Sequence, residues 1–111
     1  MPIERGGVYW VNFDPAIGGE IQKTRPAIVV SNDAANAALN RVQVIPITSK
    51  TDRIYPGEAL VQVKGEARKA MADQLTTASK LRFGKRVDVL SNSDMARVEA
   101  AVALQLGLQL K

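Results

Sequence analysis

Short apolar runs alternate along this chain with polar segments that contain glycine, proline or asparagine. Runs of this length that are rich in Val and Ile are typical of β-strands. We therefore expect strands over 8–13, 27–31, 42–47, 59–63, 69–75 and 87–90. Residues 64–66 read as a turn that joins two of them into a hairpin. Pro46 places the third strand at an edge, at an end or at a bulge, because proline cannot donate to a ladder.

Helical spacing of apolar residues appears chiefly near the end of the chain. Met95, Val98, Val102 and Leu106 form one apolar stripe, and Ser93 is a candidate N-cap. Gly107 is expected to end this helix. We also expect a short helix that is capped by Asn32 or Asp33 and runs to residue 40, and one helical turn over 77–81. The pattern predicts a mainly β fold with a C-terminal α-helix, a small curved antiparallel sheet or partly open barrel.

Length and composition narrow the possible function classes. The 111 residues fit one domain, 1–111. The chain has neither cysteine nor histidine, which excludes disulfides, thiolate zinc sites, Ser-His-Asp hydrolases and histidine-dependent ribonucleases. We therefore expect no metal site and no cofactor. No apolar run approaches the length of a membrane span, so we expect a cytoplasmic protein. The net charge of +4 fits either an ordinary solvated surface or an acidic partner such as nucleic acid.

One segment has a candidate chemical role. Gly18 and Gly19 open a polar loop that runs through Glu20, Gln22 and Lys23 to Arg25, and Pro26 then begins an apolar strand. Proline disfavours helix at the residue before it, so Arg25 is expected to be fixed at the mouth of the strand. A planar, permanently charged donor in such a place suits a phosphate or a carboxylate.

Polar residues next to two other strands are candidate neighbours of Arg25. Thr48 and Ser49 follow the strand over 42–47, and would lie near Arg25 if the two strands are adjacent and antiparallel. Asp73 and Gln74 fall inside the expected strand over 69–75, where aspartate is unusual. The alternative is structural. Arg25 then pairs with Glu20 or Asp73 on the surface, and Thr48 caps local backbone.

Cations elsewhere could track a phosphate backbone or serve only solubility. Only Tyr55 and Phe83 are available for base stacking, which disfavours an RNA binder built mainly on stacked bases.

These motifs, taken together and in order, resemble the MazF/PemK/Kid family of toxin endoribonucleases. The resemblance rests first on the strand after Gly7 with Asp14-Pro15, and on Gly18-x-Glu20-x4-Arg25-Pro26 with the strand that follows to Ser31. It also rests on the segments 46–49 and 72–77, and on Lys85-Arg86 with Leu90-Ser91. It covers nearly the whole chain.

The resemblance implies an SH3-like barrel that works as a homodimer and cleaves single-stranded RNA without a metal, at a short recognition sequence. It also implies a cognate MazE-like antitoxin whose acidic, flexible segment blocks the RNA groove. The catalytic arginine of the family falls on Arg25 and its catalytic hydroxyl on Thr48. Some relatives use an arginine two places before the Asp, where this chain has Met71, and a histidine that this chain lacks.

The remaining site residues fall into two groups. Loop residues that support the reaction are expected to be Gly18, Gly19, Glu20 and Lys23. Candidate RNA contacts are Gln22, Asn32, Ser49, Lys50, Arg53, Asp73, Gln74, Lys80 and Arg82. The glycine loop is expected to move and to close over substrate.

The chemistry needs no histidine, since the RNA 2′-hydroxyl can attack the adjacent phosphorus while Arg25 stabilises charge on the phosphoryl oxygens. The residue that accepts the proton stays unassigned between Glu20, Asp73 and others. Two other functions stay open, a gyrase-binding toxin of the CcdB type and an inactive RNA-binding barrel.

Overall fold

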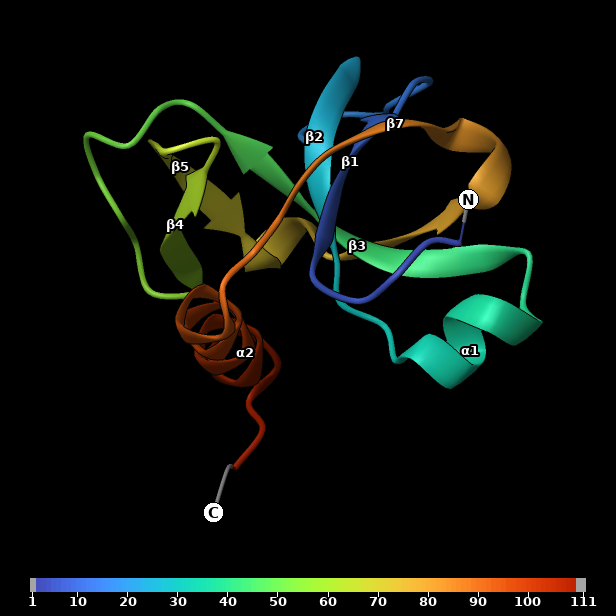
Figure 1. Cartoon of the computed structure of the whole chain (residues 1–111). Helices are drawn as coiled ribbons and strands as arrows, with labels where there is room; N and C mark the ends of the chain where they lie inside the picture. The colour runs from blue at the N-terminus through green and yellow to red at the C-terminus, as the bar shows by residue number, and fades with distance from the viewer. Residues whose placement is uncertain (1, 110–111) are drawn as a thin grey trace.

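A computed structural model describes residues 2–109 and shows a curled antiparallel sheet with a long helix packed beneath part of it (Figure 1). The elements in chain order are β1 (Gly7–Asn12), β2 (Thr24–Val29), α1 (Asp33–Ala38), β3 (Arg41–Thr48), β4 (Glu58–Val63), β5 (Glu66–Met71), the 3₁₀ helix η1 (Ala72–Gln74), β6 (Thr76–Ser79), the 3₁₀ helix η2 (Lys80–Arg82), β7 (Phe83–Val89) and α2 (Asn92–Leu106). The expected fold class, mainly β with a C-terminal α-helix, is confirmed. Neither α-helix within these residues is long and apolar enough to cross a membrane.

Strand β3 is a central strand that pairs with three other strands of the sheet. The hydrogen-bonded order is β4-β5-β3-β2-β1-β7, and β6 pairs with β3 outside this path. Along one side β3 pairs with β2, and along the other it pairs first with β6 over 41–44 and then with β5 at 47–48. Pro46 lies where the partner changes from β6 to β5, so no strand on that side requires its missing N–H. Pro46 thus lies inside a central strand and not at an edge of the sheet, and the change of partner strand explains why proline fits there.

Two predicted boundaries near the candidate site are wrong. Strand β2 begins at Thr24, so Arg25 and Pro26 lie within the strand instead of before it. Strand β5 ends at Met71, and Asp73 and Gln74 lie in η1 instead of in a strand. Asp is poorly suited to a pleated ladder, and the chain leaves the sheet where this residue occurs.

The segment after η1 was predicted to be a helical turn over 77–81 and is instead strand β6, followed by η2. The β-branched pair Thr76 and Thr77 suits a strand, and β3 supplies a partner edge that local sequence could not reveal. Strand β7 likewise begins earlier than predicted, at Phe83, because Phe83 pairs with Val11 of β1.

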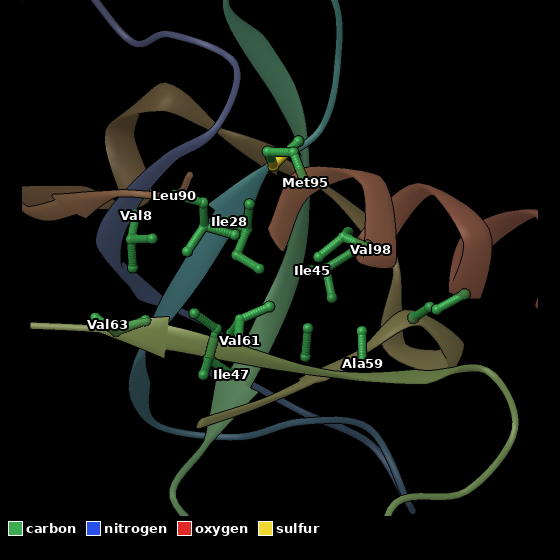
Figure 2. Packing of buried hydrophobic residues seen from close by; sticks show 13 residues of the cluster. Val8, Ile28, Ile45, Ile47, Ala59, Val61, Val63, Leu90, Met95 and Val98 are labelled. Atoms are coloured by element: carbon green, nitrogen blue, oxygen red, sulfur yellow. The ribbon is translucent and has the colours of Figure 1, made fainter. Parts of the chain in front are cut away.

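Apolar residues on the two faces of the sheet form two clusters. One cluster lies between the sheet and α2 and includes Val8, Ile28, Ile45, Val61 and Val98 (Figure 2). The other lies on the opposite face and contains Tyr9, Val11, Ala27, Val29, Val42, Val44 and Ala78. Successive residues of β2 and β3 alternate between the clusters, which explains why these strands are almost continuously apolar.

Helix α2 is capped at both ends by the residues that flank it. Its N-cap is Ser91 rather than Ser93, and the Ser91 Oγ accepts from the backbone N–H of Asp94 at 3.1 Å. Gly107 ends the helix in the left-handed conformation, as predicted. Of the predicted stripe, Met95 and Val98 are buried, Val102 is half-buried, and Leu106 is 55% exposed.

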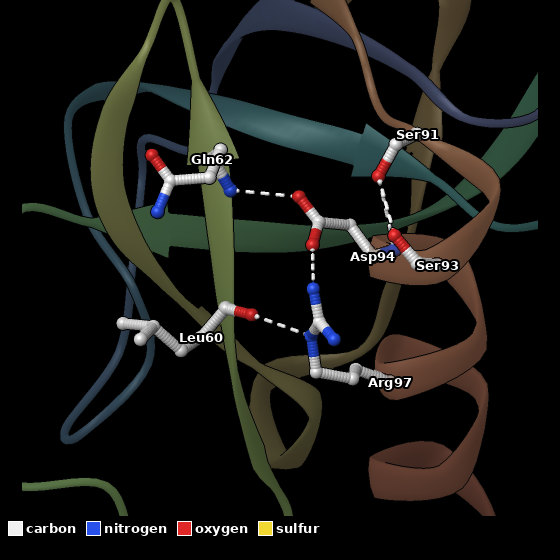
Figure 3. Close-up of polar contacts among 6 residues, drawn as sticks. All are labelled: Leu60, Gln62, Ser91, Ser93, Asp94 and Arg97. Carbon is white, nitrogen blue, oxygen red and sulfur yellow. Dashed lines mark hydrogen bonds and ion pairs between the residues drawn. The ribbon is translucent and has the colours of Figure 1, made fainter.

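A polar cluster fixes α2 against β4 (Figure 3). The buried Asp94 carboxylate accepts from the backbone N–H of Gln62 at 2.8 Å and forms an ion pair with Arg97. Arg97 also donates from Nε to the carbonyl of Leu60 at 3.3 Å. The helix therefore docks on the backbone of β4 through specific hydrogen bonds as well as through apolar packing.

Candidate active site

Arg25 is held by strand pairing at its backbone and by one hydrogen bond at its side chain. It lies opposite Val11 in the β1–β2 ladder and is half-buried. Its Nε donates to the backbone carbonyl of Gln22 at 2.9 Å. The ion pairs found within residues 2–109 involve other cations, so the alternative in which Arg25 pairs with Glu20 or Asp73 is not observed. The two terminal nitrogens of the guanidinium are left to bind an anion.

Thr48 is the last residue of β3. The β2–β3 ladder ends at the pair Ala27 and Pro46, and Arg25 and Thr48 each lie two residues beyond that pair, next to the end of the ladder. Side chains along a strand alternate between the two faces of the sheet. Arg25 and Thr48 therefore lie on the same face as Ala27 and the apolar cluster that contains Tyr9. The predicted antiparallel neighbourhood of these two strands is confirmed. The Thr48 Oγ1 accepts from the N–H of Lys50 at 3.3 Å, which is the local backbone contact that the structural alternative predicted for Thr48. The hydroxyl proton stays available for donation to another group.

The loop between β1 and β2 is closed at its base by backbone and side-chain contacts. Lys23 has a positive φ of 69°, its N–H donates to the Asp14 carboxylate at 2.8 Å, and its carbonyl accepts from Phe13. Arg82 donates to the carbonyls of Asn12 at 2.9 Å and Asp14 at 2.6 Å. Arg82 therefore stabilises the base of the loop, and its contact with RNA stays a prediction.

The loop tip is shaped by Glu20 and Gly18. The Glu20 carboxylate accepts from the N–H of Ile17 at 2.8 Å, which closes a tight turn. Gly18 has a φ of +60°, a conformation that favours glycine, and no other atom lies within 4 Å of where a Cβ would stand on Gly18 or Gly19. Both glycines thus face open space.

Gln74 links the loop to η1. Its Oε1 accepts from the N–H of Ile21 at 3.2 Å, and its Nε2 donates to the carbonyl of Gly19 at 3.2 Å. Gln74 therefore positions the loop, and its contact with RNA stays a prediction. Asp73, its neighbour, is exposed.

A cavity of about 370 Å³ opens between the loop and the segment from η1 to β6. Phe13 and Ala78 lie at its apolar side, and Glu20, Asp73 and Thr77 contribute polar groups. The lining includes Ile21, the sequence neighbour of Gln22, whose carbonyl holds the Arg25 side chain. Arg25 and Thr48 themselves are not among the lining residues.

Two predicted RNA contacts lie at the other end of the sheet. The Asn32 side chain caps α1 by accepting from Ala35 N–H at 2.8 Å, and α1 follows the end of β2 distant from Arg25. The Lys80 ammonium donates to the carbonyl of Asn36 at 2.5 Å. Lys80 also lines a larger cavity of about 1040 Å³ between α1 and β7. The structure does not bring either residue to Arg25 and Thr48.

One cation near Thr48 was missing from the predicted site. Lys69 of β5 pairs with Thr48 in the β3–β5 ladder, and its ammonium lies 3.3 Å from a Glu58 oxygen. It also donates to the carbonyl of Arg53 at 3.2 Å, which ties the loop after Thr48 to the sheet. Ser49 and Lys50 are exposed at the start of that loop. Only the pairing of β3 with β5 reveals the position of Lys69.

Within residues 2–109 no group of three or more histidine, cysteine, aspartate or glutamate side chains is placed to hold a metal ion. The predicted site contributes the Arg25 guanidinium and the Thr48 hydroxyl, and the carboxylates of Glu20 and Asp73 line the cavity.

Comparisons with known proteins agree on one family. A family model described as PemK-like, MazF-like toxin of type II toxin-antitoxin system matches residues 4–106. Endoribonuclease MazF9 of Mycobacterium tuberculosis is 33% identical over 96% of this chain and 98% of its own length. Endoribonuclease MazF of Staphylococcus epidermidis is 32% identical over 96% and 92%.

Solved structures show the same fold. MazF of Deinococcus radiodurans superposes with a TM-score of 0.85 at 26% identity, over 97% of this chain and 99% of that one. A mycobacterial endoribonuclease in complex with its cognate antitoxin superposes with a TM-score of 0.82 at 24% identity, over 98% and 99%. The chain therefore belongs to the PemK-like, MazF-like toxins of type II toxin-antitoxin systems.

Proposed function

We propose that this chain is an endoribonuclease that cleaves single-stranded RNA at a short recognition sequence without a metal, with Arg25 and Thr48 at the reacting phosphate. The observation that carries this proposal is the antiparallel β2–β3 ladder, which ends two residues before Thr48 in β3 and two residues after Arg25 in β2. Two relatives that are named endoribonucleases match this chain over almost their whole length, and they support the same activity.

The reaction follows from the chemistry of RNA itself. The 2′-oxygen attacks the adjacent phosphorus, the bond from phosphorus to the 5′-oxygen breaks, and the products are a 2′,3′-cyclic phosphate and a 5′-hydroxyl. Negative charge grows on the two non-bridging phosphoryl oxygens during the attack. Both terminal nitrogens of Arg25 can donate to these oxygens, and the Thr48 hydroxyl supplies a further donor.

Two proton transfers complete the reaction. The 2′-hydroxyl must lose a proton, and the 5′-oxygen must gain one. Arginine is a poor base at neutral pH, so Arg25 acts chiefly through charge stabilisation and as a donor toward the leaving oxygen. The carboxylates of Glu20 and Asp73 are the candidate acceptors for the 2′-proton, and Glu20 already accepts the N–H of Ile17 through one oxygen.

We further propose that the protein acts in the cytoplasm as a homodimer, and that a MazE-like antitoxin with an acidic, flexible segment inhibits it. The mycobacterial endoribonuclease solved with its cognate antitoxin, and MazE–MazF complexes of Deinococcus radiodurans, support an antitoxin partner. The basic character of the chain, with a net charge of +4, suits an acidic inhibitor.

The gyrase-binding alternative is not favoured, because the family model and the curated relatives describe MazF-like toxins and endoribonucleases.

The test is incubation of the purified protein with a long single-stranded RNA in excess EDTA, followed by mapping of the RNA ends. Discrete cuts with 2′,3′-cyclic phosphate and 5′-hydroxyl ends are expected. RNA retention without cuts would show an inactive RNA-binding barrel, and inhibition of gyrase without cuts would show the CcdB type of toxin.

A further inference from the structure

Tyr55 is an exposed aromatic side chain with two cations near its ring. It lies in the loop between β3 and β4 and is 52% exposed. The Arg53 guanidinium carbon and the Lys69 ammonium each lie 5.8 Å from the centre of its ring. A half-exposed aromatic ring beside two positive charges can bind a flat ligand that also carries negative charge.

The surroundings hold the ring in place. The backbone N–H of Tyr55 donates to one oxygen of Glu58 at 2.7 Å, and the Lys69 ammonium lies 3.3 Å from the other. Arg53 donates to the Tyr55 hydroxyl at 3.3 Å. One carboxylate thus fixes both the backbone of Tyr55 and the neighbouring cation, so little conformational freedom is lost when a ligand binds.

The ring also lies close to the proposed reaction site. Lys69 is the direct partner of Thr48 in the β3–β5 ladder, and the same Lys69 ammonium approaches the Tyr55 ring. A ligand that reaches Thr48 and continues over β5 therefore meets this ring and its cations.

We propose that Tyr55 stacks against one base of the bound single-stranded RNA, next to the nucleotides that flank the cleaved bond, while Arg53 contacts the adjacent phosphate. This inference rests on the proposed function. A base offers a π-face to the ring and its phosphate offers negative charge to Arg53, which matches both features of the surface. Every base has a π-face, so Tyr55 contributes to affinity for RNA rather than to the choice of recognition sequence.

The test uses an RNA that contains the cleavage sequence found by end mapping, with 2′-deoxy sugar at the cleaved nucleotide so that it binds without reacting. Fluorescence anisotropy gives its Kd. Tyr55→Leu is expected to raise Kd roughly five- to a hundredfold, whereas Tyr55→Phe, which keeps the ring, is expected to stay within about threefold. The exposed position of Tyr55 leaves the core untouched in both variants.

An abasic substitution at each nucleotide in turn identifies the stacked base. One abasic position is expected to weaken binding of the wild-type protein and to have no further effect on Tyr55→Leu. Equal Kd values for the wild type and Tyr55→Leu would overturn the proposal, and so would an effect of Tyr55→Leu confined to antitoxin binding. Failure of the wild-type protein to cleave RNA would instead refute the proposed function, so the two failures are distinguishable.

Discussion

The Nε of Arg25 donates to the backbone carbonyl of Gln22 at 2.9 Å, so the catalytic candidate is anchored by the loop that precedes it. The same loop is held at its tip by Gln74 and at its base by Arg82. The orientation of the guanidinium therefore depends on contacts from three separate parts of the chain.

Loss of the Arg25 side chain is expected to abolish most of the cleavage activity. Arg25→Ala should lower the single-turnover rate by about 10²–10³-fold, since it removes a donor to the charged transition state. Arg25→Lys keeps the charge but loses the paired donors and the Nε anchor, so an intermediate rate is expected. Arg41→Ala is the control, because Arg41 lies at the opposite end of β3 from Thr48. A fully active Arg25→Ala variant would refute the assigned role.

Removal of the Thr48 hydroxyl is expected to slow cleavage with little change in stability. Thr48→Val has nearly the same shape but no donor, and the single-turnover rate should fall by roughly 10²-fold. Thr48→Ser keeps the hydroxyl and should stay near the wild-type rate. Thermal unfolding of both variants checks that the fold is intact. Equal rates for Val and Ser at this position would show that the hydroxyl takes no part in the reaction.

Loss of the Gln74 amide is expected to release the loop between β1 and β2. Gln74→Ala removes two hydrogen bonds, to Ile21 and to Gly19, each worth about 0.5–1.5 kcal/mol. Amide hydrogen exchange at Ile21 should accelerate, and KM for RNA should rise. Gln74→Glu keeps the acceptor for Ile21 but loses the donor to Gly19, so it should show a smaller effect. Unchanged exchange at Ile21 in Gln74→Ala would show that other contacts order the loop.

Local patterns predicted most of the sheet and the end of α2 at Gly107, because strand propensity, turn glycines and helical spacing act over a few residues. Strand β6 escaped prediction because its ladder with β3 joins segments far apart in the chain. The antiparallel pairing of the two apolar strands that carry Arg25 and Thr48 was also predictable. The place of Lys69 beside Thr48, and the anchoring of the loop by Gln74, depend on tertiary pairing that no local pattern records.

Acid is expected to destabilise the fold partly through Asp88. Its carboxylate accepts from the N–H groups of Lys64 and Val89, and these bonds hold its pKa below the ordinary 3.8. In acid the unfolded chain therefore binds more protons than the folded chain. The stabilisation of the fold by the Asp88 carboxylate is complete above about pH 4 and is lost as pH falls through the lowered pKa. Asp88→Asn should therefore make the free energy of unfolding fall less steeply below pH 4. An identical acid slope in wild type and variant would contradict this prediction.

The buried Asp94 is expected to matter more for stability than the exposed ion pair of Arg5 and Glu99. Asp94→Ala leaves the N–H of Gln62 without its acceptor and Arg97 without its partner, and should cost about 2–4 kcal/mol. Glu99→Gln breaks an ion pair of 2.7 Å between partly exposed side chains and should cost less than about 1 kcal/mol. Urea unfolding at one fixed protein concentration measures both, so that any dimerisation affects them equally. Similar losses in the two variants would show that the contacts of Asp94 with β4 and Arg97 contribute no more than an exposed ion pair.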